Sequence, residues 1–312
     1  MSPDKKVETD VEGRRIVLSN LDKVLYPKSG FTKGQVIDYY ARIADVMLPH
    51  IVDRPLTLKR YPDGVDSKAF FEKHASSHTP SWVRRSLVPS SGGRHEPIEF
   101  VVICDRATLV WAANLAAIEL HVPLWRVGDG RDLPKPPDHT VFDLDPGPGT
   151  SIVECCQVAT LIAEHNGGTE RIFAKTSGSK GLQLYVALSH VSSEEARQEA
   201  HDLARALESD HRSAVVSNMR KELRNQKVLI DWSQNSPSKT TVAAYSLRAR
   251  PDPTVSTPVT WEEIESCASK GDETSLRFTP GEVLARVELL GDLLAPLAKG
   301  RPPPVSPKPH LR

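Results

Sequence analysis

The segment TVFDLDPG, residues 140–147, decides how the rest of the chain is interpreted. Apolar and acidic residues alternate in it, and alternate side chains of a β-strand lie on opposite faces. Phe142 and Leu144 are therefore expected to face a core, while Asp143 and Asp145 project together on the other face. The Pro-Gly pair that follows ends the strand. The pattern predicts a strand that brings two carboxylates to one place.

Two neighbouring carboxylates repel each other unless a cation lies between them, so this pair is a candidate Mg²⁺ or Mn²⁺ site. A solvated junction between strand and turn is the alternative. Asp231 is the best candidate for a third ligand, because it ends the apolar run 228–230. Three carboxylates on neighbouring strands are what two-metal phosphoryl transfer needs. On spacing alone, an exposed strand-end aspartate remains the other interpretation of Asp231.

The segment KTSGSKG, residues 175–181, joins two apolar runs between the acidic strands. Its small residues let backbone N–H groups approach an anion, and the serines and Lys180 add donors and charge, which suits a triphosphate. A plain hairpin turn is the alternative. The P-loop pattern is absent, and the S-x-x-K match from Ser177 to Lys180 lacks the companion motifs of serine acyl enzymes.

The surrounding pattern interleaves strands and helices. Strands are predicted at 55–61, 97–103, 140–145, 171–175, 182–188 and 227–232. Helices are predicted from the capping box Thr32–Gln35 to near Pro49, and at 107–121, 152–165 and 193–209. We therefore expect an α+β or mixed α/β fold, with an N-terminal supporting lobe that ends near residue 105 and a chemistry-bearing half after it.

Composition excludes several classes of protein. The chain has 312 residues, and its 40 Lys+Arg balance 40 Asp+Glu, so any nucleic-acid binding must come from local patches. Its four cysteines include no CxxC pair, which excludes a zinc ribbon or a disulfide framework and fits a reducing cytosol. There is no apolar leader and no long apolar run, so we expect neither export nor a membrane span.

Both ends of the sequence are polar. Residues 1–13 are expected to be flexible, and residues 299–312, with five prolines and four Lys or Arg, are expected to form a disordered basic tail. The domain itself would then occupy residues 14–298.

Several single residues have two interpretations. His121 follows a predicted helix, where a lone histidine is more often a C-terminal cap than a catalyst. Phe70 and Phe71 are either buried strand residues or a platform for stacked bases. Basic residues gather in local stripes that are either phosphate contacts or solvated faces: Lys23, Lys28 and Lys33; Lys59 and Arg60; Arg220, Lys221, Arg224 and Lys227.

Taken together, these segments resemble the polymerase domain of the bacterial end-joining DNA ligase D family, a branch of the archaeo-eukaryotic primase superfamily. The resemblance covers roughly residues 14 to 295. It is carried in order by LSNLDKVLYP (18–27), LTLKRYPDG (56–64), AFFEKH (69–74), ELHVPLWR (119–126), VFDLDPG (141–147), KTSGSKGLQLY (175–185) and DWSQNSPSKTT with YSLRAR (231–250).

The resemblance implies a primase-like core of mixed and antiparallel sheets flanked by helices. It also implies roles for individual residues. Asp143, Asp145 and Asp231 would bind two Mn²⁺ or Mg²⁺ ions. The incoming NTP or dNTP would be held by Lys59, His121, Ser177, Ser179, Lys180, Arg224, Gln234 and Arg248. Phe70 and Phe71 would stack on a base, and Asn20, Lys23 and Lys33 would bind the DNA 5′-phosphate at the far side of a gap.

The expected function is therefore template-dependent addition of nucleotides, ribonucleotides favoured, to 3′-hydroxyls at gaps or broken DNA ends, in the bacterial cytoplasm at the nucleoid. Two departures matter. Gln183 stands where the family commonly has His, and the adenylation motif K-x-D-G is not met because Tyr61 begins YPDG. We expect a stand-alone polymerase that works with a ligase in trans, with Ku as a candidate partner. A DNA-end-binding scaffold with weak or lost synthesis is the alternative.

Overall fold

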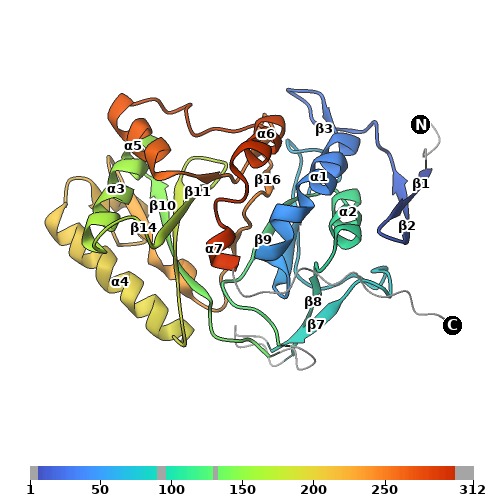
Figure 1. Cartoon of the computed structure of the whole chain (residues 1–312), viewed down its shortest axis with the longest axis horizontal. Coiled ribbons are helices and arrows are strands. Elements are labelled where there is room, and N and C mark those ends of the chain that lie inside the picture. Colours follow the sequence, from blue (N-terminus) through green and yellow to red (C-terminus); the bar gives the residue numbers. More distant parts are fainter. Residues whose placement is uncertain (1–5, 90–95, 129–132, 299–312) are drawn as a thin grey trace.

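The strand that carries the two aspartates lies inside a six-stranded sheet, which we call the C-lobe sheet (Figure 1). The computed structural model describes residues 6–89, 96–128 and 133–298. In spatial order the strands are β13 (Val215–Val216), β14 (Val228–Asp231), β10 (His139–Pro146), β12 (Leu182–Ala187), β11 (Ile172–Thr176) and β18 (Pro258–Val259). All neighbours are antiparallel except the pair β13 and β14. The four longer strands confirm the sequence prediction.

Three helices cover this sheet and supply its core. They are α3 (Ile152–His165), α4 (Ser193–Asp210) and α5 (Trp261–Lys270). Each begins at a capping box, in which a Ser or Thr bonds to the backbone of a Glu three residues on and the Glu carboxylate bonds back. Phe142 and Leu144 are buried with the apolar faces of α3 and α4. The opposite face of β10 therefore carries the aspartates, as the alternation predicts.

A second sheet organises the N-terminal part of the chain, which we call the N-lobe. Its order is β15 (Thr241–Val242), β9 (Ala117–Val122), β5 (Pro55–Arg60), β8 (Ile98–Val102) and β7 (Arg85–Val88), and β6 (Phe70–Glu72) also pairs with β5. The helices α1 (Lys33–Ile51) and α2 (Arg106–Asn114) pack against one another, and their apolar faces share one core with β5 and β9. The two lobes lie side by side in Figure 1.

The lobes are interlaced rather than sequential. After β14 the chain returns to the N-lobe as β15, forms the small hairpin β16 (Leu247–Arg248) and β17 (Thr254–Val255), and then adds α5 to the C-lobe. The last helices, α6 (Pro280–Leu290) and α7 (Ala295–Ala298), contact α1. A boundary near residue 105 is therefore wrong, because α2, β9 and the C-terminal helices belong with the N-lobe.

The largest error in the predicted elements concerns residues 107–121. Helix α2 ends at Asn114, and β9 begins at Ala117 after a turn in which Ala116 has φ 56°. The run is mostly apolar, with exceptions that include Asn114, Glu119 and His121, so periodicity does not separate a buried helix from a buried strand. Helix α1 also continues two residues past Pro49. None of the described helices is long and apolar enough to cross a membrane.

The N-terminal residues differ from expectation as well. β1 (Lys6–Val11) and β2 (Arg14–Ser19) form a hairpin, and β3 (Val24–Tyr26) and β4 (Phe31–Thr32) form another. The prediction of a flexible segment over 1–13 is thus wrong for residues 6–11, where a ladder with β2 satisfies the backbone. Residues 1–5 and the predicted tail at 299–312 lie outside the described residues.

Candidate active site

A row of polar side chains crosses four strands of the C-lobe sheet. Asp143 on β10 pairs in register with Asp231 on β14, and on its other side with Gln183 on β12. Gln183 in turn pairs with Lys175 on β11. Directly paired residues share a face of a sheet, so these four side chains form one line, with Asp145 two residues further along β10. The register brings the three aspartates onto neighbouring strand ends, as predicted.

Lys175 lies at the buried end of this row. Its side chain is only 2% exposed, and its Nζ donates to Gln183 Oε1 and, at 2.7 Å, to Ser256 Oγ. Burial lowers the pKa of Lys175, and the nearby Asp143 carboxylate opposes that shift. The lysine is thus a buried partner of the carboxylates.

Burial and mutual repulsion dominate the electrostatics of the aspartates. Burial raises the pKa of Asp143, and the neighbouring charges of Asp145 and Asp231 raise it further. Burial and Asp231 likewise raise the pKa of Asp145, against the lowering effect of Arg224 and Arg248. Such crowding of like charges is relieved by a bound cation.

The Asp231 side chain is engaged within its own segment, the short 3₁₀ helix η2 (Trp232–Asn235). Its Oδ1 accepts from Ser233 N at 3.0 Å and Ser233 Oγ at 2.6 Å, and its Oδ2 accepts from Gln234 Nε2 at 3.0 Å. Accordingly, no group of three His, Cys, Asp or Glu side chains among the described residues is gathered closely enough to hold one metal ion. The backbone register aligns Asp231 with Asp143, but the Asp231 carboxylate bonds to Ser233 and Gln234 of η2.

The chemistry of the donor set nevertheless fits hard divalent cations. Carboxylate oxygens are the ligands that Mg²⁺ and Mn²⁺ prefer. Within the described chain, the buried Oε1 of Gln234, whose Nε2 bonds to Asp231, has no hydrogen-bond partner, so an oxygen acceptor beside Asp231 remains to be satisfied. Asp143, Asp145 and Asp231 are therefore the residues that would hold such ions.

The loop between β11 and β12 is a closed turn beside the row. Ser177 Oγ accepts from the backbone N–H groups of Ser179 at 3.2 Å and Gly181 at 3.1 Å. Gly178 has φ +66°, and a Cβ there would lie 2.7 Å from the backbone of 255–256, so no larger residue fits. Ser179 and Lys180 are exposed at the tip of the turn, and Lys180 gives the tip a positive charge.

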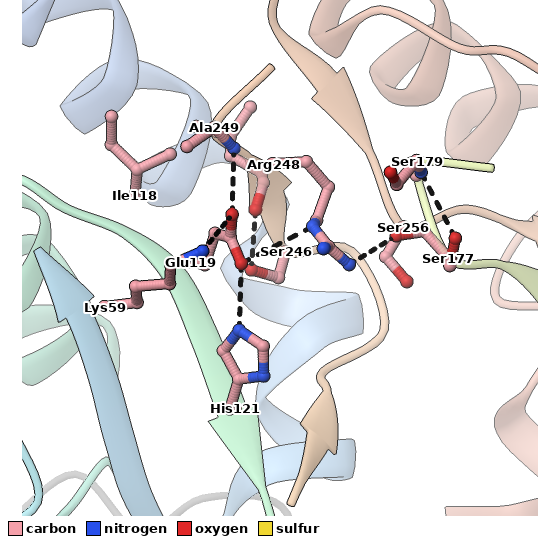
Figure 2. A network of polar contacts seen from close by, with 12 residues as sticks. Lys59, Ile118, Glu119, His121, Ser177, Ser179, Ser246, Arg248, Ala249 and Ser256 are labelled. Carbon is pink, nitrogen blue, oxygen red and sulfur yellow. Dashed lines mark hydrogen bonds and ion pairs between the residues drawn. The ribbon is translucent and has the colours of Figure 1, made fainter. Parts of the chain in front are cut away.

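A second polar cluster lies on the N-lobe sheet, centred on the Glu119 carboxylate (Figure 2). Glu119 is 2% exposed. Lys59 Nζ lies 3.3 Å from its Oε1, and His121 Nε2 and Arg248 Nε lie 2.9 and 3.5 Å from its Oε2. Ala249 N also donates to it at 3.2 Å. Burial alone would raise the pKa of Glu119, but the hydrogen bond with His121 and the nearby cations lower it to about 2.

Arg248 joins this cluster to the C-lobe. Its Nη1 donates to the Ser177 carbonyl at 2.7 Å, while its Nε faces Glu119 (Figure 2). Arg224 follows η1 (Lys221–Leu223) and donates to the Met219 carbonyl at 2.5 Å. Both arginines lower the pKa of Asp145, so their charges lie near the carboxylates. Two of the predicted phosphate-binding residues, Arg224 and Arg248, therefore lie near the acidic row, and Arg248 connects that row to the Glu119 cluster.

The two phenylalanines are exposed on β6. Phe71 is 65% exposed and pairs in register with Lys59, whose Nζ lies 5.4 Å from the Phe71 ring centroid. Phe70 is also exposed. Burial in a core is therefore excluded for both, and their rings are available for stacking next to the cation cluster.

Asn20, Lys23 and Lys33 come together at the start of α1. Lys33 N donates to the Lys23 carbonyl at 2.8 Å, and Asn20 has φ 55° in the turn before β3. Lys33 is buried and its Nζ donates to the Ser19 carbonyl at 2.7 Å, whereas Lys23 reaches the exposed Asp63 at 3.1 Å. The three residues are thus grouped, with Lys33 Nζ engaged by Ser19, and their role as an anion pocket stays a prediction.

Sequence reasoning missed Glu119 and the partnership of Lys175. Glu119 lies in the run that was wrongly predicted to be helical. Its position two residues before His121 on one face of a strand was therefore not predicted. A charged residue inside an apolar run, as in AIELHV (117–122), is the signal that could have found it, because buried charges need partners.

Comparisons with known proteins identify the family of this chain. Residues 32–294 match the family described as LigD, primase-polymerase domain. The chain is 44% identical over 290 residues to the multifunctional non-homologous end joining protein LigD of Mycolicibacterium smegmatis, covering 92% of this chain and 37% of that protein. It is 30% identical over 283 residues to the bifunctional LigD of Bacillus subtilis, covering 89% and 43%. The chain thus spans less than half of these relatives.

A solved structure is also similar throughout. The polymerase domain of Mycobacterium tuberculosis ligase D, in complex with DNA, has a TM-score of 0.85 and 43% sequence identity, and the match covers 92% of this chain and 99% of that one. The family match, the sequence identities and the fold therefore agree, and this chain belongs to the LigD primase-polymerase family.

Proposed function

We propose that this protein is a template-directed nucleotidyltransferase that adds nucleotides to 3′-hydroxyls at gaps or broken DNA ends during end-joining repair. The observation that carries the proposal is the pairing of Asp143 with Asp231, with Asp145 beside them and with Arg248, which also contacts Glu119, near Asp145. Carboxylates that can bind metal ions, together with cationic side chains that can bind phosphates, suit a metal-bound triphosphate.

The chain's own residues divide the work by position. Asp143, Asp145 and Asp231 would hold two Mg²⁺ or Mn²⁺ ions, and the bound ions would supply activation of the attacking hydroxyl and neutralise the charge of the triphosphate. The triphosphate is held by Lys59, His121, Ser177, Ser179, Lys180, Arg224, Gln234 and Arg248. Catalysis is then positional and electrostatic rather than covalent.

DNA is held at both sides of the nucleotide. The exposed rings of Phe70 and Phe71 stack on a base, a contact that tolerates any sequence. The cluster of Asn20, Lys23 and Lys33 binds the downstream 5′-phosphate. A DNA ligase, and Ku as an end-binding partner, act with it to complete the repair of the break in the bacterial nucleoid.

Gln183, which stands where the family commonly has His, is compatible with synthesis. Its Oε1 accepts from Lys175 and, at 3.0 Å, from Tyr185 OH, and its hydrogen bond to Asp143 lowers the pKa of that carboxyl. A neutral amide thus orients the acidic row without carrying a proton.

The proposal is tested by primer extension on a duplex with a one-nucleotide gap, with Mg²⁺ or Mn²⁺ and with each nucleotide set. We expect templated addition that depends on the metal, with kcat/KM higher for ribonucleotides than for deoxyribonucleotides, because a contact to the 2′-hydroxyl is lost in the deoxy sugar. Equal kcat/KM for the two sugars would refute the sugar preference. If neither metal supports extension, the proposed polymerase activity is refuted, and the alternative function, a DNA-end-binding scaffold, remains.

A further inference from the structure

A cavity of about 390 Å³ lies beside the nucleotide site, at the N-terminal end of β5. One wall is apolar: Phe100, Trp125 and Val88 form a small cluster separate from both lobe cores. Trp125 Nε1 donates to the Pro237 carbonyl at 2.9 Å, which fixes the segment 237–240 as part of the lining. The volume lies within the range of about 300–1,000 Å³ that is usual for small-ligand sites.

The polar groups of this cavity point to an anion with a planar part. Thr57 is 2% exposed, and its Oγ1 has no hydrogen-bond partner among the described residues. Lys73 and Lys239 also line the cavity, are exposed, and form no ion pair with any acid in the described chain. No acidic side chain is among the described lining residues. Aromatic walls, a free hydroxyl and two unpaired cations suit a base with its phosphates.

The cavity continues the face that holds the nucleotide cluster. Thr57 pairs in register with His121, and alternation puts it on the same face of β5 as Lys59. Lys73 directly follows β6, whose register places it next to Thr57. Two residues of strand separate Thr57 from Lys59, which is about 7 Å. A chain of nucleotides can therefore pass from one site to the other.

The opposite end of β5 indicates which DNA strand the cavity would bind. The chain leaves β5 through residues 61–65 towards the 5′-phosphate cluster: Val65 N donates to the Leu25 carbonyl at 2.8 Å, and Asp63 pairs with Lys23 at 3.1 Å. The downstream strand therefore belongs at that end. The primer must approach the nucleotide from the other side, where the cavity lies.

We propose that the cavity binds a nucleotide of the single-stranded 3′ overhang that carries the primer terminus. The base lies against Phe100 and Trp125, Thr57 Oγ1 bonds to a base or sugar atom, and Lys73 and Lys239 contact the flanking phosphates. This inference rests on the proposed function, since it names the strand that the same site extends.

Photocrosslinking of the wild-type protein tests the location. A 3′-overhang duplex carries 5-iodouracil at the second or third nucleotide from the primer end, and crosslinked peptides are identified by mass spectrometry. We expect crosslinks within 98–103 or 123–126. Crosslinks found only elsewhere would overturn the proposal. So would crosslinks at this cavity from free 5-iodo-dUMP but not from the overhang, which would make it a mononucleotide site.

Affinity measurements test the contacts with a matched control. Wild type should prefer a four-nucleotide 3′ overhang to the blunt duplex by about fivefold or more, and the Lys73→Gln/Lys239→Gln protein should lose that preference. Its salt dependence, the slope of log K against log [salt], should be shallower by about 1.4, since each single-strand phosphate contact contributes about 0.7. The Lys6→Gln/Lys270→Gln protein carries the same change in charge on exposed residues and should behave as wild type.

Two further measurements separate the possible failures. Thr57→Val removes only the hydroxyl and should weaken overhang binding without affecting blunt-duplex binding. An unchanged overhang preference in both this variant and the double lysine variant would refute the cavity. Gap filling by wild type is scored in parallel: if it occurs while the overhang preference is absent, the polymerase stands and this inference fails.

Discussion

At the scale of single residues, Glu119 holds the nucleotide site together. One buried carboxylate faces Lys59, His121 and Arg248, and Arg248 continues to the Ser177 carbonyl of the other lobe. Without its charge, the two cations Lys59 and Arg248 and the His121 imidazole lose their common anchor. Glu119 is thus a positioning residue, because it acts on the triphosphate through its neighbours.

Replacing Glu119 by Gln should weaken nucleotide binding more than chemistry. Hydrogen bonds to charged groups are worth about 1.5–3 kcal/mol, so we expect KM for the nucleotide to rise by about tenfold or more, with a smaller change in kcat. Steady-state gap filling measures both constants. Glu119→Asp should recover part of the loss, and exposed Glu199→Gln serves as control. An unchanged KM in Glu119→Gln would contradict the positioning role.

The low pKa of Glu119 also predicts a pH dependence of stability. A folded pKa of about 2, against about 4.3 unfolded, means that its charge stabilises the fold above pH ~4.3 and that this contribution is lost as the pH falls towards 2. The difference in unfolding free energy between wild type and Glu119→Gln should therefore narrow below pH ~4.3. Urea titrations at several pH values measure it, and a difference that stays constant would contradict the assignment.

The sequence allowed part of this site to be predicted at the residue scale. Asp143 and Asp145 could be predicted because alternation along one strand is a local pattern. The burial of Phe142 and Leu144 confirms that alternation. Glu119 and Lys175 were not, because their roles depend on partners contributed by distant segments. A single sequence does not show which segments the sheet register will pair.

At the scale of elements, the C-terminal segment between α6 and α7 ties onto α1. His50 Nε2 lies 2.8 Å from Asp292 Oδ2, Tyr245 OH donates to Oδ1 at 2.7 Å, and Leu294 N donates to Oδ1 at 3.0 Å. Burial alone would raise the pKa of Asp292, but these hydrogen bonds and the His50 charge lower it. This contact fastens the end of the domain to its first helix.

Asp292→Asn should therefore destabilise the protein. Loss of charge-assisted hydrogen bonds at a mostly buried position predicts a decrease of about 1–3 kcal/mol in the free energy of unfolding. Urea denaturation measures the change. Exposed Glu288→Gln on α6 is the control and should have little effect, and equal stability of the two variants would contradict the role of Asp292.

The elements themselves were largely predictable, with one instructive exception. Helix α3 has the predicted bounds, because its Ser151 capping box marks the start and its apolar stripe has a clear helical period. The prediction for the run after α2 was wrong because LAAIEL (115–120) is apolar except for Glu119 and shows no clear period, and only pairing with β5 makes it a strand. Tertiary pairing decided the structure where local pattern was ambiguous.

At the scale of the whole molecule, the site exists only because the lobes interlace. β15 crosses to the N-lobe directly after η2, and the Arg248 that follows bonds back to the C-lobe loop. A linear boundary near residue 105 would have separated His121 from its sheet. The motifs could therefore be predicted from the sequence. Their distribution between the two lobes could not, because it depends on how the chain crosses from one lobe to the other.

The same arrangement predicts selectivity for a downstream 5′-phosphate. The Lys23→Gln/Lys33→Met protein removes both charges while keeping much of the apolar stem of buried Lys33. Each charge-assisted contact is worth about 1.5–3 kcal/mol, so affinity for gapped DNA bearing the phosphate should fall at least about tenfold, with little change for DNA lacking it. Paired titrations measure this, with Lys270→Gln as control. No preference of wild type for the phosphorylated duplex would refute the pocket.

The most direct test of the acidic row is the rate of single-nucleotide addition at a one-nucleotide gap by wild type and by Asp143→Ala, at saturating nucleotide and Mn²⁺. Losing a principal electrostatic stabiliser predicts a fall of at least about a hundredfold. DNA affinity, measured on the same duplex, should stay near that of wild type because Asp143 is assigned to the metals. Near wild-type addition by Asp143→Ala would contradict the assignment of the active site.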